Sequence, residues 1–472
     1  MKKYTLIVIG TGSAMNLIEP YLHRYPDASI AVVDKDDPGG ICLNKGCIPT
    51  KMLLYPADCV REIEHFRHLG IEARVNSVHF HSIMERMRLH VFSEMSTIRE
   101  NLENTDIIDY YRAEARFLKP GILELGGRKV KGEMIFLCTG SRPLIPPVDG
   151  LEETGYLTSD TVLDLETLPK RLVIIGGGYI AAEYGHFFSA MGSEVTIIGR
   201  NPRFLKEEEP EISTVAQSEL ANYMTIRTDV EVIRTEEKKD GKHVTAKDGT
   251  DGEVFEITAD EILVAAGRRS NSDLLDPEAG GVETDEAGWI RVDEHLRTSQ
   301  PNVWAFGDAT GRHQFKHAAN YESEVVYYNA VGGQDEPPAV DYHAVPHAVF
   351  TYPEIASVGM GEEDAVAAFD EENVLIGIEE YGNTAKGIAM GIEESNYFVK
   401  VILKNGTGEI LGAHIIGPQA SVLIQEIVNC MYAPRRRFPF DGMHIHPALS
   451  EVVQRAFSNI MTAHDYRHHL QQ

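Results

Sequence analysis

The alternation of apolar and polar positions gives the same pattern twice along the chain. Residues 4–13 (YTLIVIGTGS) and 171–183 (RLVIIGGGYIAAE) each begin with an apolar strand, continue through a glycine turn and enter a helical pattern. Each is followed by another apolar strand, SIAVVD at 29–34 and EVTIIG at 194–199. Strand, helix and strand in this order predict a βαβ unit with parallel strands. Two such units predict two nucleotide-binding domains.

The remaining patterns complete the predicted architecture. Apolar residues at spacings near three and four predict helical structure over 60–105, and short alternating runs predict strands over 228–264. Proline-rich segments at 141–150 and 334–346 are typical of linkers. The last part, 345–472, mixes strands with helices. The expected fold class is therefore α/β, with two Rossmann-like domains and a C-terminal α+β domain.

Composition narrows the class of protein. The 472 residues are 43% hydrophobic and 8% aromatic, which is enough for sizeable cores. The formal charge of −28 disfavours nucleic acid and anionic membrane surfaces as partners. Gly10 interrupts the first apolar run before it reaches the length of a signal peptide, and no stretch approaches a membrane span. Five scattered cysteines do not make a secreted disulfide framework. We therefore expect a soluble cytoplasmic protein.

The first glycine turn has two of the three small residues of a dinucleotide-binding fingerprint. Gly10 and Gly12 allow a tight turn and a close approach of the backbone to a pyrophosphate. Met15 replaces the usual third small residue and is expected to crowd helix–strand packing. Asp34 ends the next strand, near the offset expected for a carboxylate that binds ribose hydroxyls. The alternative for Asp34 is a helix cap or an exposed turn residue.

The second glycine turn, GGGYIA at 176–181, is a complete fingerprint. The strand after it ends in Gly199 and Arg200, with Arg203 and Lys206 beyond. A carboxylate at this strand end would select NAD, whereas an arginine can pair with a 2′-phosphate. The pattern therefore favours NADPH. The alternative is that these cations are solvated loop residues.

Two of the five cysteines lie in one short segment, GGICLNKGCIPTK at 39–51. In a regular helix Cys42 and Cys47 would be too far apart for a disulfide, but Gly46 and Pro49 argue against a regular helix. Core packing, a metal site and a reactive dithiol all stay open from these residues alone. Because a zinc site needs about four ligands and there is no second cysteine pair, no metal is predicted.

Taken together, the motifs resemble the class I flavoprotein disulfide reductases, the pyridine nucleotide-disulfide oxidoreductase family that includes dihydrolipoamide dehydrogenase, glutathione reductase and mycothione reductase. The resemblance rests on GGICLNKGCIPTK, FLCTGSRP, LVAAGRRSN, WAFGD and HIHPALSEVV, and it covers essentially the whole chain. Within the family it is greatest to mycothione reductases, through GTGS, CIPTKMLLYPA, SNSDLLD, FKHAANYE and IHPAL. It implies an FAD-binding domain at 1–148 and 273–340, an NAD(P)-binding domain at 149–272 and a dimerisation domain at 341–472.

The resemblance also implies roles for individual residues. Cys47 would lie nearest the flavin and Cys42 would exchange with substrate, while His446, oriented by Glu451 and supplied by the other subunit of a homodimer, would be the base. The implied catalytic residues are Cys42, Cys47, His446, Glu451, Lys51 and Glu183, the last two as a buried ion pair beside the flavin. The implied cofactor-binding residues are Gly10, Gly12, Ser13, Asp34, Lys51, Thr139, Gly140, Gly176, Gly178, Tyr179, Ile180, Glu183, Arg200, Lys206, Gly267, Arg268, Gly307 and Asp308.

Two of these residues also have an ordinary structural interpretation. Asp308, expected at the ribityl or pyrophosphate part of FAD, is equally placed to cap a helix. Tyr179, expected to cover the nicotinamide pocket, is equally placed to pack on the sheet. The sequence alone leaves both alternatives open.

The implied activity is a relay in which hydride passes from NADPH, or alternatively NADH, through FAD to a Cys42–Cys47 disulfide. The electrons then reach a low-molecular-weight disulfide of the mycothione or γ-glutamyl-thiol type. The alternatives are a dihydrolipoamide dehydrogenase that uses NAD and a redox-sensing flavoprotein without turnover. Mercuric-ion reduction is set aside because the C-terminal HDYRHHLQQ contains no cysteine pair. We expect the arginines at 435–437 either to face a carboxylate-rich disulfide or to lie in a surface loop.

Overall fold

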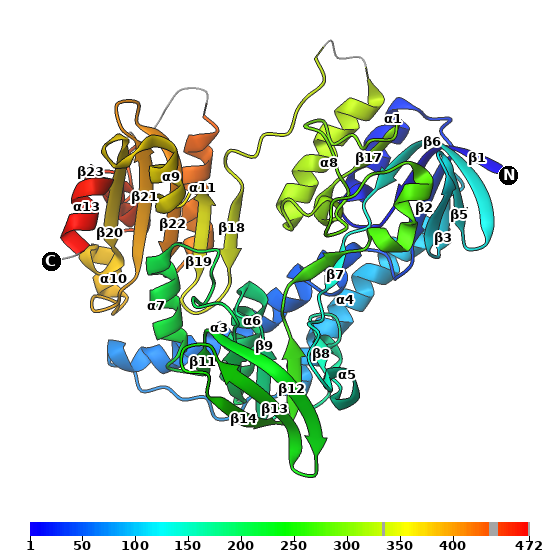
Figure 1. The fold of residues 1–472 in the computed structure, drawn as a ribbon. Helices are drawn as coiled ribbons and strands as arrows, with labels where there is room; N and C mark the ends of the chain where they lie inside the picture. Colours follow the sequence, from blue (N-terminus) through cyan, green and yellow to red (C-terminus); the bar gives the residue numbers. More distant parts are fainter. Residues whose placement is uncertain (333–335, 434–441, 471–472) are drawn as a thin grey trace.

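Three sheets organise the chain into three lobes in the computed structural model, which describes residues 1–332, 336–433 and 442–470 (Figure 1). The arginines at 435–437, for which the sequence suggests a substrate contact, lie outside the described residues. No helix in the described part of the chain has both the length and the apolar character needed to cross a membrane.

The first sheet is assembled from segments that lie far apart in the sequence. Its order is β3-β2-β1-β6-β5-β4, with β17 paired to residues Ile135–Leu137 of β6, beyond the part that pairs with β5. The parallel strands are β1 (Lys2–Ile9), β2 (Ile30–Asp34), β3 (Ile108–Arg112), β6 (Arg128–Leu137) and β17 (Val303–Ala305); β4 (Ala115–Lys119) and β5 (Ile122–Leu125) run antiparallel. Helices α1 (Ile18–Arg24) and α8 (Lys316–Val331) share a core with β1 and β2. This is the first predicted Rossmann-like domain.

The second sheet repeats the arrangement. Its order is β11-β10-β9-β15-β8 and all of its strand pairs are parallel. The strands are β8 (Leu157–Thr158), β9 (Arg171–Ile175), β10 (Glu194–Ile198), β11 (Thr225–Arg227) and β15 (Glu261–Val264), with helices α5 (Leu151–Thr154), α6 (Tyr179–Met191) and α7 (Pro210–Leu220). A small antiparallel sheet of β12 (Val230–Lys238), β13 (Gly241–Asp248) and β14 (Val254–Ala259) follows. The strands predicted over 228–264 are thus confirmed.

Two short strands join these lobes. β7 (Ser141–Pro143) pairs antiparallel with β16 (Arg268–Ser270), at the points where the chain leaves the first lobe and returns to it. The proline-rich segment at 141–150 therefore begins as one strand of this connection.

The cysteine-containing segment forms two helices, α2 (Gly40–Asn44) and α3 (Cys47–His65). The expectation that it is not one regular helix is confirmed, because the break falls at Lys45 and Gly46. A Cβ on Gly46 would lie 3.1 Å from the carbonyl oxygen of Ile41, so the chain turns tightly there. Pro49 is tolerated because it lies in the first turn of α3, where backbone N–H groups have no partner within the helix.

The helical prediction for residues 60–105 is correct only at its two ends. α3 ends at His65 and a short 3₁₀ turn (Phe66–Leu69) follows, whereas α4 begins at Phe80 and runs to Glu103. Gly70 has a φ of +76°, a left-handed conformation that stops the helix. Residues 71–79 contain no helix, so the prediction is wrong there.

The third sheet is antiparallel and carries the α+β domain expected from the sequence. Its order is β18-β19-β22-β21-β20-β23. The strands are β18 (Pro346–Val349), β19 (Ile355–Gly359), β20 (Val374–Glu380), β21 (Phe398–Lys404), β22 (Glu409–Ile416) and β23 (Ile460–Thr462). The helices are α9 (Glu362–Phe369), α10 (Ala385–Ala389), α11 (Ala420–Met431), α12 (Ser450–Ala456) and α13 (Ala463–Leu470).

Candidate functional site

A cavity of about 1350 Å³ lies where the lobes meet. The first glycine turn, the cysteine helices, the start of α6 and strand β18 all contribute to its wall. The predicted residues that line it are Gly10, Gly12, Ser13, Asp34, Cys42, Cys47, Lys51, Thr139, Gly140, Tyr179, Ile180, Glu183, Arg268, Gly307 and Asp308. The predicted residues that do not line it are Gly176, Gly178, Arg200, Lys206, Gly267, His446 and Glu451.

The two glycines of the first turn are needed for different reasons. Gly10 has a φ of +104°, and a Cβ there would lie 2.1 Å from the carbonyl oxygen of Cys138. Gly12 has a φ of −78°, and no described atom lies within 4 Å of the place its Cβ would take. Gly10 is therefore required by the backbone, whereas the missing side chain at Gly12 leaves open space at the cavity wall.

Met15 follows this turn in a 3₁₀ segment, Ser13–Leu17, before α1 begins at Ile18. The second turn passes directly into the α-helix at Tyr179, and Ala181, at the corresponding position, is fully buried. The first helix therefore begins with a 3₁₀ turn, whereas the second is α-helical from its first residue.

Asp34 lies at the cavity wall and caps no helix. Its carboxylate accepts hydrogen bonds from the backbone N–H of Thr11 at 2.9 Å, the hydroxyl of Thr11 at 2.5 Å and the N–H of Asp36 at 3.1 Å. Burial raises the pKa of Asp34, although these bonds oppose the shift. The carboxylate is thus held in place at the end of β2, as a ribose ligand would require.

Asp308 is held in the same way, by a residue that the sequence did not single out. The hydroxyl of Ser141 donates to Asp308 at 2.6 Å and accepts from Arg268 Nε at 2.7 Å. The side chain of Asp308 makes no capping bond to its own 3₁₀ turn, Gly307–Thr310. The N–H of Gly307 donates to the buried Glu322 at 2.5 Å, so a second acid fixes the backbone of this turn.

The two cysteines face each other across the break between α2 and α3. Both sulfurs are thiols in the structure; Cys42 is half-buried and Cys47 is exposed toward the cavity. A hydrogen bond from Cys42 lowers the pKa of Cys47 to about 7; burial opposes the shift and the charge of Lys51 adds to it. The same hydrogen bond, with burial, raises the pKa of Cys42. One thiolate is therefore favoured, at Cys47.

This arrangement separates the three interpretations of the cysteine pair. Neither sulfur is packed in a core, because both line the cavity. Among the described residues, no group of three potential metal ligands includes Cys42 or Cys47. A low thiol pKa beside a partner thiol is the environment of reactive cysteines.

Lys51 and Glu183 form the ion pair implied by the resemblance, but only its acid is buried, because 37% of the Lys51 side chain is exposed. Lys51 Nζ lies 2.9 and 2.8 Å from the two oxygens of Glu183, which is 5% exposed. The backbone N–H of Phe350 donates to the same carboxylate at 3.1 Å, and its ring centroid lies 4.5 Å from Lys51 Nζ. A residue of the C-terminal lobe thus completes the surroundings of this pair.

Tyr179 lies at the cavity rather than against the sheet. Its side chain is 40% exposed and lines the cavity. Partial burial raises its pKa to about 12, so the phenol stays protonated. Packing on the sheet is therefore not its main environment.

The second glycine turn and the segment after β10 lie together outside the cavity. Gly176 has a φ of +143° and its Cβ would lie 2.1 Å from the carbonyl oxygen of Ala265, whereas no described atom lies within 4 Å of a Cβ on Gly178. We call residues 199–209 the coenzyme loop, after the role predicted for its cations. It is bound to the turn by a hydrogen bond from the N–H of Leu205 to the carbonyl of Gly177 at 2.8 Å.

The predicted phosphate-binding cations project from this loop. Arg200 and Lys206 are exposed, and the only carboxylate near Lys206 in the described chain is that of exposed Glu207, at 3.3 Å. Arg203 is partly buried and donates to the carbonyl of Lys206 at 2.7 Å. Gly267, also predicted, has a φ of +120° and accepts from the N–H of Leu144 at 2.9 Å, beside the lobe connection.

His446 and Glu451 are paired but lie away from the cysteines of their own chain. His446 Nδ1 is 2.9 Å from Glu451, which also accepts from the N–H of Ala448 at 3.1 Å. The hydrogen bond from His446 lowers the pKa of Glu451, and the imidazole is 69% exposed. His444 has a different environment, because it is almost fully buried against Glu426 at 2.7 Å.

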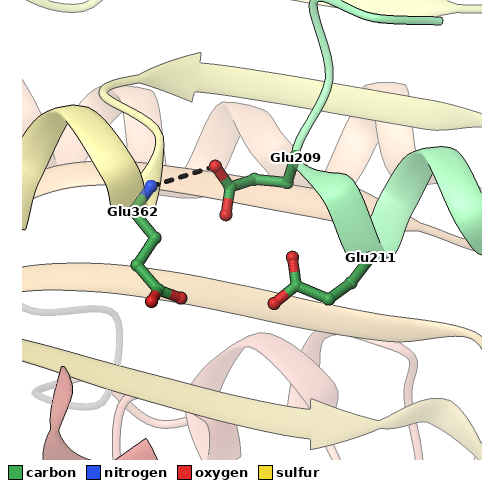
Figure 2. Close-up of side chains that lie close together, drawn as sticks. All are labelled: Glu209, Glu211 and Glu362. Carbon is green, nitrogen blue, oxygen red and sulfur yellow. Dashed lines mark hydrogen bonds between the residues drawn. The ribbon is translucent and has the colours of Figure 1, made fainter. Parts of the chain in front are cut away.

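Three buried or half-buried glutamates meet outside the cavity, and Figure 2 shows Glu209 and Glu211 from the start of α7 facing Glu362 of α9. Such a group could in principle hold a cation. Lys400 Nζ already occupies it, at 2.7 Å from Glu209, 2.9 Å from Glu211 and 2.8 Å from Glu362. The cluster is therefore an ion-pair network rather than a vacant metal site.

The sequence missed several side chains at the cavity wall or directly behind it. Ser141, Glu322 and Lys316, whose Nζ donates to Ser13 Oγ at 3.0 Å, all support predicted residues. The quoted FKHAANYE motif contains both Lys316 and Glu322, so it is the signal that could have pointed to this region. Ser141 lies in the quoted FLCTGSRP motif, but no role was predicted for its hydroxyl.

Comparisons with known proteins agree with this geometry. Residues 4–323 match the family described as pyridine nucleotide-disulphide oxidoreductase, and residues 345–457 match its dimerisation domain. A mycothione reductase of Mycobacterium tuberculosis is 36% identical over 97% of this chain and 99% of its own length. A dihydrolipoyl dehydrogenase of Synechocystis is 34% identical over 96% of this chain and 98% of its own length. Among solved structures, the HOCl-induced flavoprotein disulfide reductase RclA from Escherichia coli, in a Cu(II) complex, has a TM-score of 0.84 at 28% identity and covers 97% of this chain and 99% of its own.

Proposed function

Because this chain belongs to the pyridine nucleotide-disulfide oxidoreductase family, we propose that it is an NADPH-dependent reductase of a small disulfide. The substrate class is the mycothione or γ-glutamyl-thiol type. The observation that carries the proposal is the pair of cavity-lining thiols, Cys42 and Cys47, with the pKa of Cys47 lowered to about 7 beside Lys51. Residues 1–148 with 273–340 bind FAD, 149–272 bind the coenzyme and 341–472 form the dimer.

The residues at the cavity fit FAD, the cofactor that family flavoproteins bind. Gly12 leaves space against the backbone, and Asp34 and Asp308 are carboxylates held at strand ends. The hydroxyl of Thr139 is buried without a partner among the described residues, as expected of a ligand contact. When bound there, the flavin would accept a hydride from the pyridine nucleotide and deliver two electrons to the Cys42–Cys47 disulfide.

The protein's own residues then carry out thiol–disulfide exchange. The sulfur of Cys42 attacks the substrate disulfide, which forms a mixed disulfide and releases one thiolate. His446 of the partner subunit, held by Glu451, takes the proton of the Cys42 thiol as it attacks and passes it to this leaving thiolate. The Cys47 thiolate then attacks Cys42 and releases the second thiolate, which takes a proton from solvent. The Cys42–Cys47 disulfide is thereby restored, and its next reduction needs the two electrons from the coenzyme.

The preference for NADPH rests on the coenzyme loop. Gly199 stands where an acid would bind a ribose 2′-hydroxyl, and a carboxylate there would repel a 2′-phosphate. Arg200 and Lys206 lie on the loop that is bonded to the glycine turn, with exposed side chains. A guanidinium and an ammonium so placed are suitable partners for a phosphate.

Dihydrolipoamide dehydrogenase activity is the second candidate, supported by the 34% identity to the Synechocystis enzyme over 96% of this chain. It uses the same dithiol in the opposite direction. The two candidates differ in coenzyme and in substrate, so one set of measurements separates them.

The test is an anaerobic titration of the flavin-loaded protein with NADPH and NADH, followed by rates on mycothiol disulfide, γ-glutamyl disulfides and lipoamide. We expect reduction by NADPH, a long-wavelength absorbance band that Cys47→Ser removes, and turnover of a small disulfide. Turnover of dihydrolipoamide with NAD alone would favour the second candidate. Undiminished disulfide turnover after alkylation of Cys42 and Cys47, or a folded protein that takes up no FAD, would contradict both.

A further inference from the structure

The coenzyme loop ends in two consecutive buried acids. Glu208 is 5% exposed and Glu209 is 6% exposed. Buried carboxylates are costly unless they are paired and hydrogen-bonded. The side-chain partners that the described structure gives to both acids lie in the C-terminal lobe, on the other side of a lobe boundary.

Glu208 makes the first anchor. One oxygen lies 2.7 Å from His347 Nε2 on β18, and the other accepts from the hydroxyl of Ser357 on β19 at 2.7 Å. Burial alone would raise the pKa of Glu208, but the hydrogen bond and charge of His347, with the hydrogen bond from Ser357 and the charge of His414, together hold the pKa below its usual range. The loop is thus tied to the edge of the third sheet by a charged hydrogen bond and a neutral one.

Glu209 makes the second anchor, in the network of Figure 2. One oxygen is 2.7 Å from Nζ of Lys400, whose side chain has no exposed surface, and the other accepts from the N–H of Glu362 at 2.9 Å. Arg467 Nε lies 2.7 Å from Glu362 and brings a second cation to the network. This anchor joins the start of α7 to β21 and α9.

Between these anchors and the glycine turn, the loop has little freedom. Leu205 has a φ of +49°, its N–H donates to Gly177 and its carbonyl accepts from the N–H of Glu208 at 2.9 Å. Lys206 stands immediately between the two attachment points. Its position relative to the second glycine turn is therefore fixed by contacts that lie in two different lobes.

We infer that Glu208 and Glu209 position the coenzyme loop for a 2′-phosphate, so that discrimination between NADPH and NADH depends on His347 and Lys400 of the C-terminal lobe. This rests on the proposed function, since it deepens the assignment of NADPH. The four residues are positioning residues that act through Arg200 and Lys206. The glycine turn, which approaches the part common to both coenzymes, is built by the second lobe alone.

His347 also connects the anchor to the cavity. It lines the cavity wall, and its ring is stacked on Phe315 with centroids 5.7 Å apart and planes 4° apart. Phe315 is stacked in turn on His317, at 5.4 Å. One side chain therefore contacts the end of the coenzyme loop and also lines the cavity that contains the cysteines.

The test compares Glu208→Gln and His347→Gln with the wild type, as flavin-loaded protein. Ser357→Ala, which removes only the neutral hydrogen bond, is the milder variant if the others fold poorly. His243→Gln is the matched control, because His243 is also a buried imidazole paired with a glutamate, Glu256 at 2.7 Å. His243 lies on β13, in the same lobe as the coenzyme loop but outside the loop. Dissociation constants for NADPH and NADH are measured anaerobically by fluorescence quenching of protein already reduced with dithionite, so that no hydride is transferred. Tryptic cleavage after Arg200, Arg203 and Lys206 is timed without coenzyme.

For Glu208→Gln and His347→Gln we expect the dissociation constant for NADPH to rise by about tenfold, as loss of one charge-assisted contact implies, and that for NADH to change by less than about twofold. Ser357→Ala should also raise the dissociation constant for NADPH, by a smaller factor. Cleavage in the loop should be faster in all three variants, and His243→Gln should match the wild type in both measurements.

The outcomes are distinguishable. Equal changes for the two coenzymes, or an unchanged NADPH constant with faster cleavage, would overturn the role in selectivity. Unchanged cleavage would overturn the anchoring itself. A wild type that binds NADH as tightly as NADPH would instead contradict the proposed coenzyme, and with it the selectivity role, while the cleavage rates still decide whether the loop is anchored.

Discussion

The lowered pKa of Cys47 depends on a few neighbouring side chains. The thiol of Cys42 and the ammonium of Lys51 both favour the thiolate, against the cost of burial. Lys51 is in turn fixed by Glu183, which also accepts the N–H of Phe350. Cys47 is also the first residue of the 19-residue helix α3, and a helix N-terminus favours a thiolate as well.

Replacing Lys51 should raise the pKa of Cys47. In Lys51→Met the nearest cation is lost and the thiolate is less stable, so we expect the midpoint to move from about 7 toward the ordinary thiol range, by roughly one unit. The measurement is the pH dependence of iodoacetamide alkylation in the reduced protein without coenzyme. Lys316→Met is the control, because Lys316 favours the thiolate of Cys42 instead. An unchanged midpoint in Lys51→Met would show that Lys51 does not set it.

The first glycine turn predicts a contrast between two alanine variants. Gly12→Ala places its Cβ in open space, so we expect a folded protein whose stability changes by less than about 1 kcal/mol but which binds FAD poorly. Gly10→Ala meets the carbonyl of Cys138 with an unfavourable φ, and should lower stability by several kcal/mol. Thermal unfolding of the flavin-free proteins and visible absorbance of bound flavin give the two readouts. Full flavin binding by Gly12→Ala would argue against this turn as the flavin site.

Among the elements, strand β18 joins two functions. Its His347 bonds Glu208 at the end of the coenzyme loop, and its chain continues to Phe350 beside the Lys51–Glu183 pair. Helices α3 and α6 are linked in a similar way, by Lys51–Glu183 and by Asp58 with the buried His186 at 2.8 Å. The catalytic region is therefore held by pairs between elements rather than within them.

The His347–Glu208 pair gives stability a pH dependence. Burial opposes the charged imidazole, but Glu208 raises the pKa of His347 above its value in the unfolded chain, about 6.5. The contribution of His347 to folding stability is therefore complete below about pH 6.5 and is lost as the pH rises through the pKa of the folded state. The pKa of Glu208 is lowered in the folded state, so its contribution to folding stability is present above about pH 4.5 and is lost as the pH falls through the pKa of the folded state. The other groups that face His347 are Glu207 of the loop, Ser357 of β19 and His317 of α8, whose pKa burial lowers.

His347→Gln should therefore unfold at a lower temperature than the wild type, by about 4 °C between about pH 5 and 6.5, with a smaller difference on either side. Differential scanning calorimetry of the flavin-loaded proteins measures it. Ser357→Ala removes a neutral bond and should give a smaller offset that varies little with pH. If the unfolding temperature of His347→Gln differed from that of the wild type by the same amount from pH 5 to 9, the pair would not be charged.

At the scale of the whole molecule, the cavity and the base lie apart in one chain. His446 is 69% exposed and does not line the cavity that holds Cys42 and Cys47. The C-terminal lobe matches a dimerisation domain, and apolar side chains such as Val422 and Ile445 are exposed on it. These features support the proposal that two subunits complete each site.

Mixing inactive variants tests this proposal. Cys42→Ser and His446→Ala are each expected to be inactive, but hybrids formed after subunit exchange should have one intact site and restore about a quarter of wild-type activity, since about half of randomly mixed dimers are hybrid. A mixture of Cys42→Ser with Cys47→Ser is the control, because both lesions lie in the same chain's thiol pair and no hybrid has an intact site. Equal rates in the two mixtures would exclude a shared site.

The sequence by itself determined the features that depend on local pattern. Apolar runs followed by glycine turns fixed two βαβ units, and the dithiol segment, the break near Gly46 and the antiparallel strands of 228–264 follow from residues that are close in the chain. The helix expected over 71–79 failed because Gly70 ends the preceding helix in a left-handed conformation, and the spacing of apolar residues does not register that.

Only the tertiary structure decided which distant groups meet. Lys51 and Glu183 are 132 residues apart, and His347 and Glu208 are 139 apart. The first pair was reached through a resemblance and the second was not anticipated at all. Ion pairs and hydrogen bonds between lobes depend on how the sheets pack, and periodicity along one segment carries no information about that packing. The cavity, the pKa of Cys47 and the anchoring of the coenzyme loop all belong to this second class.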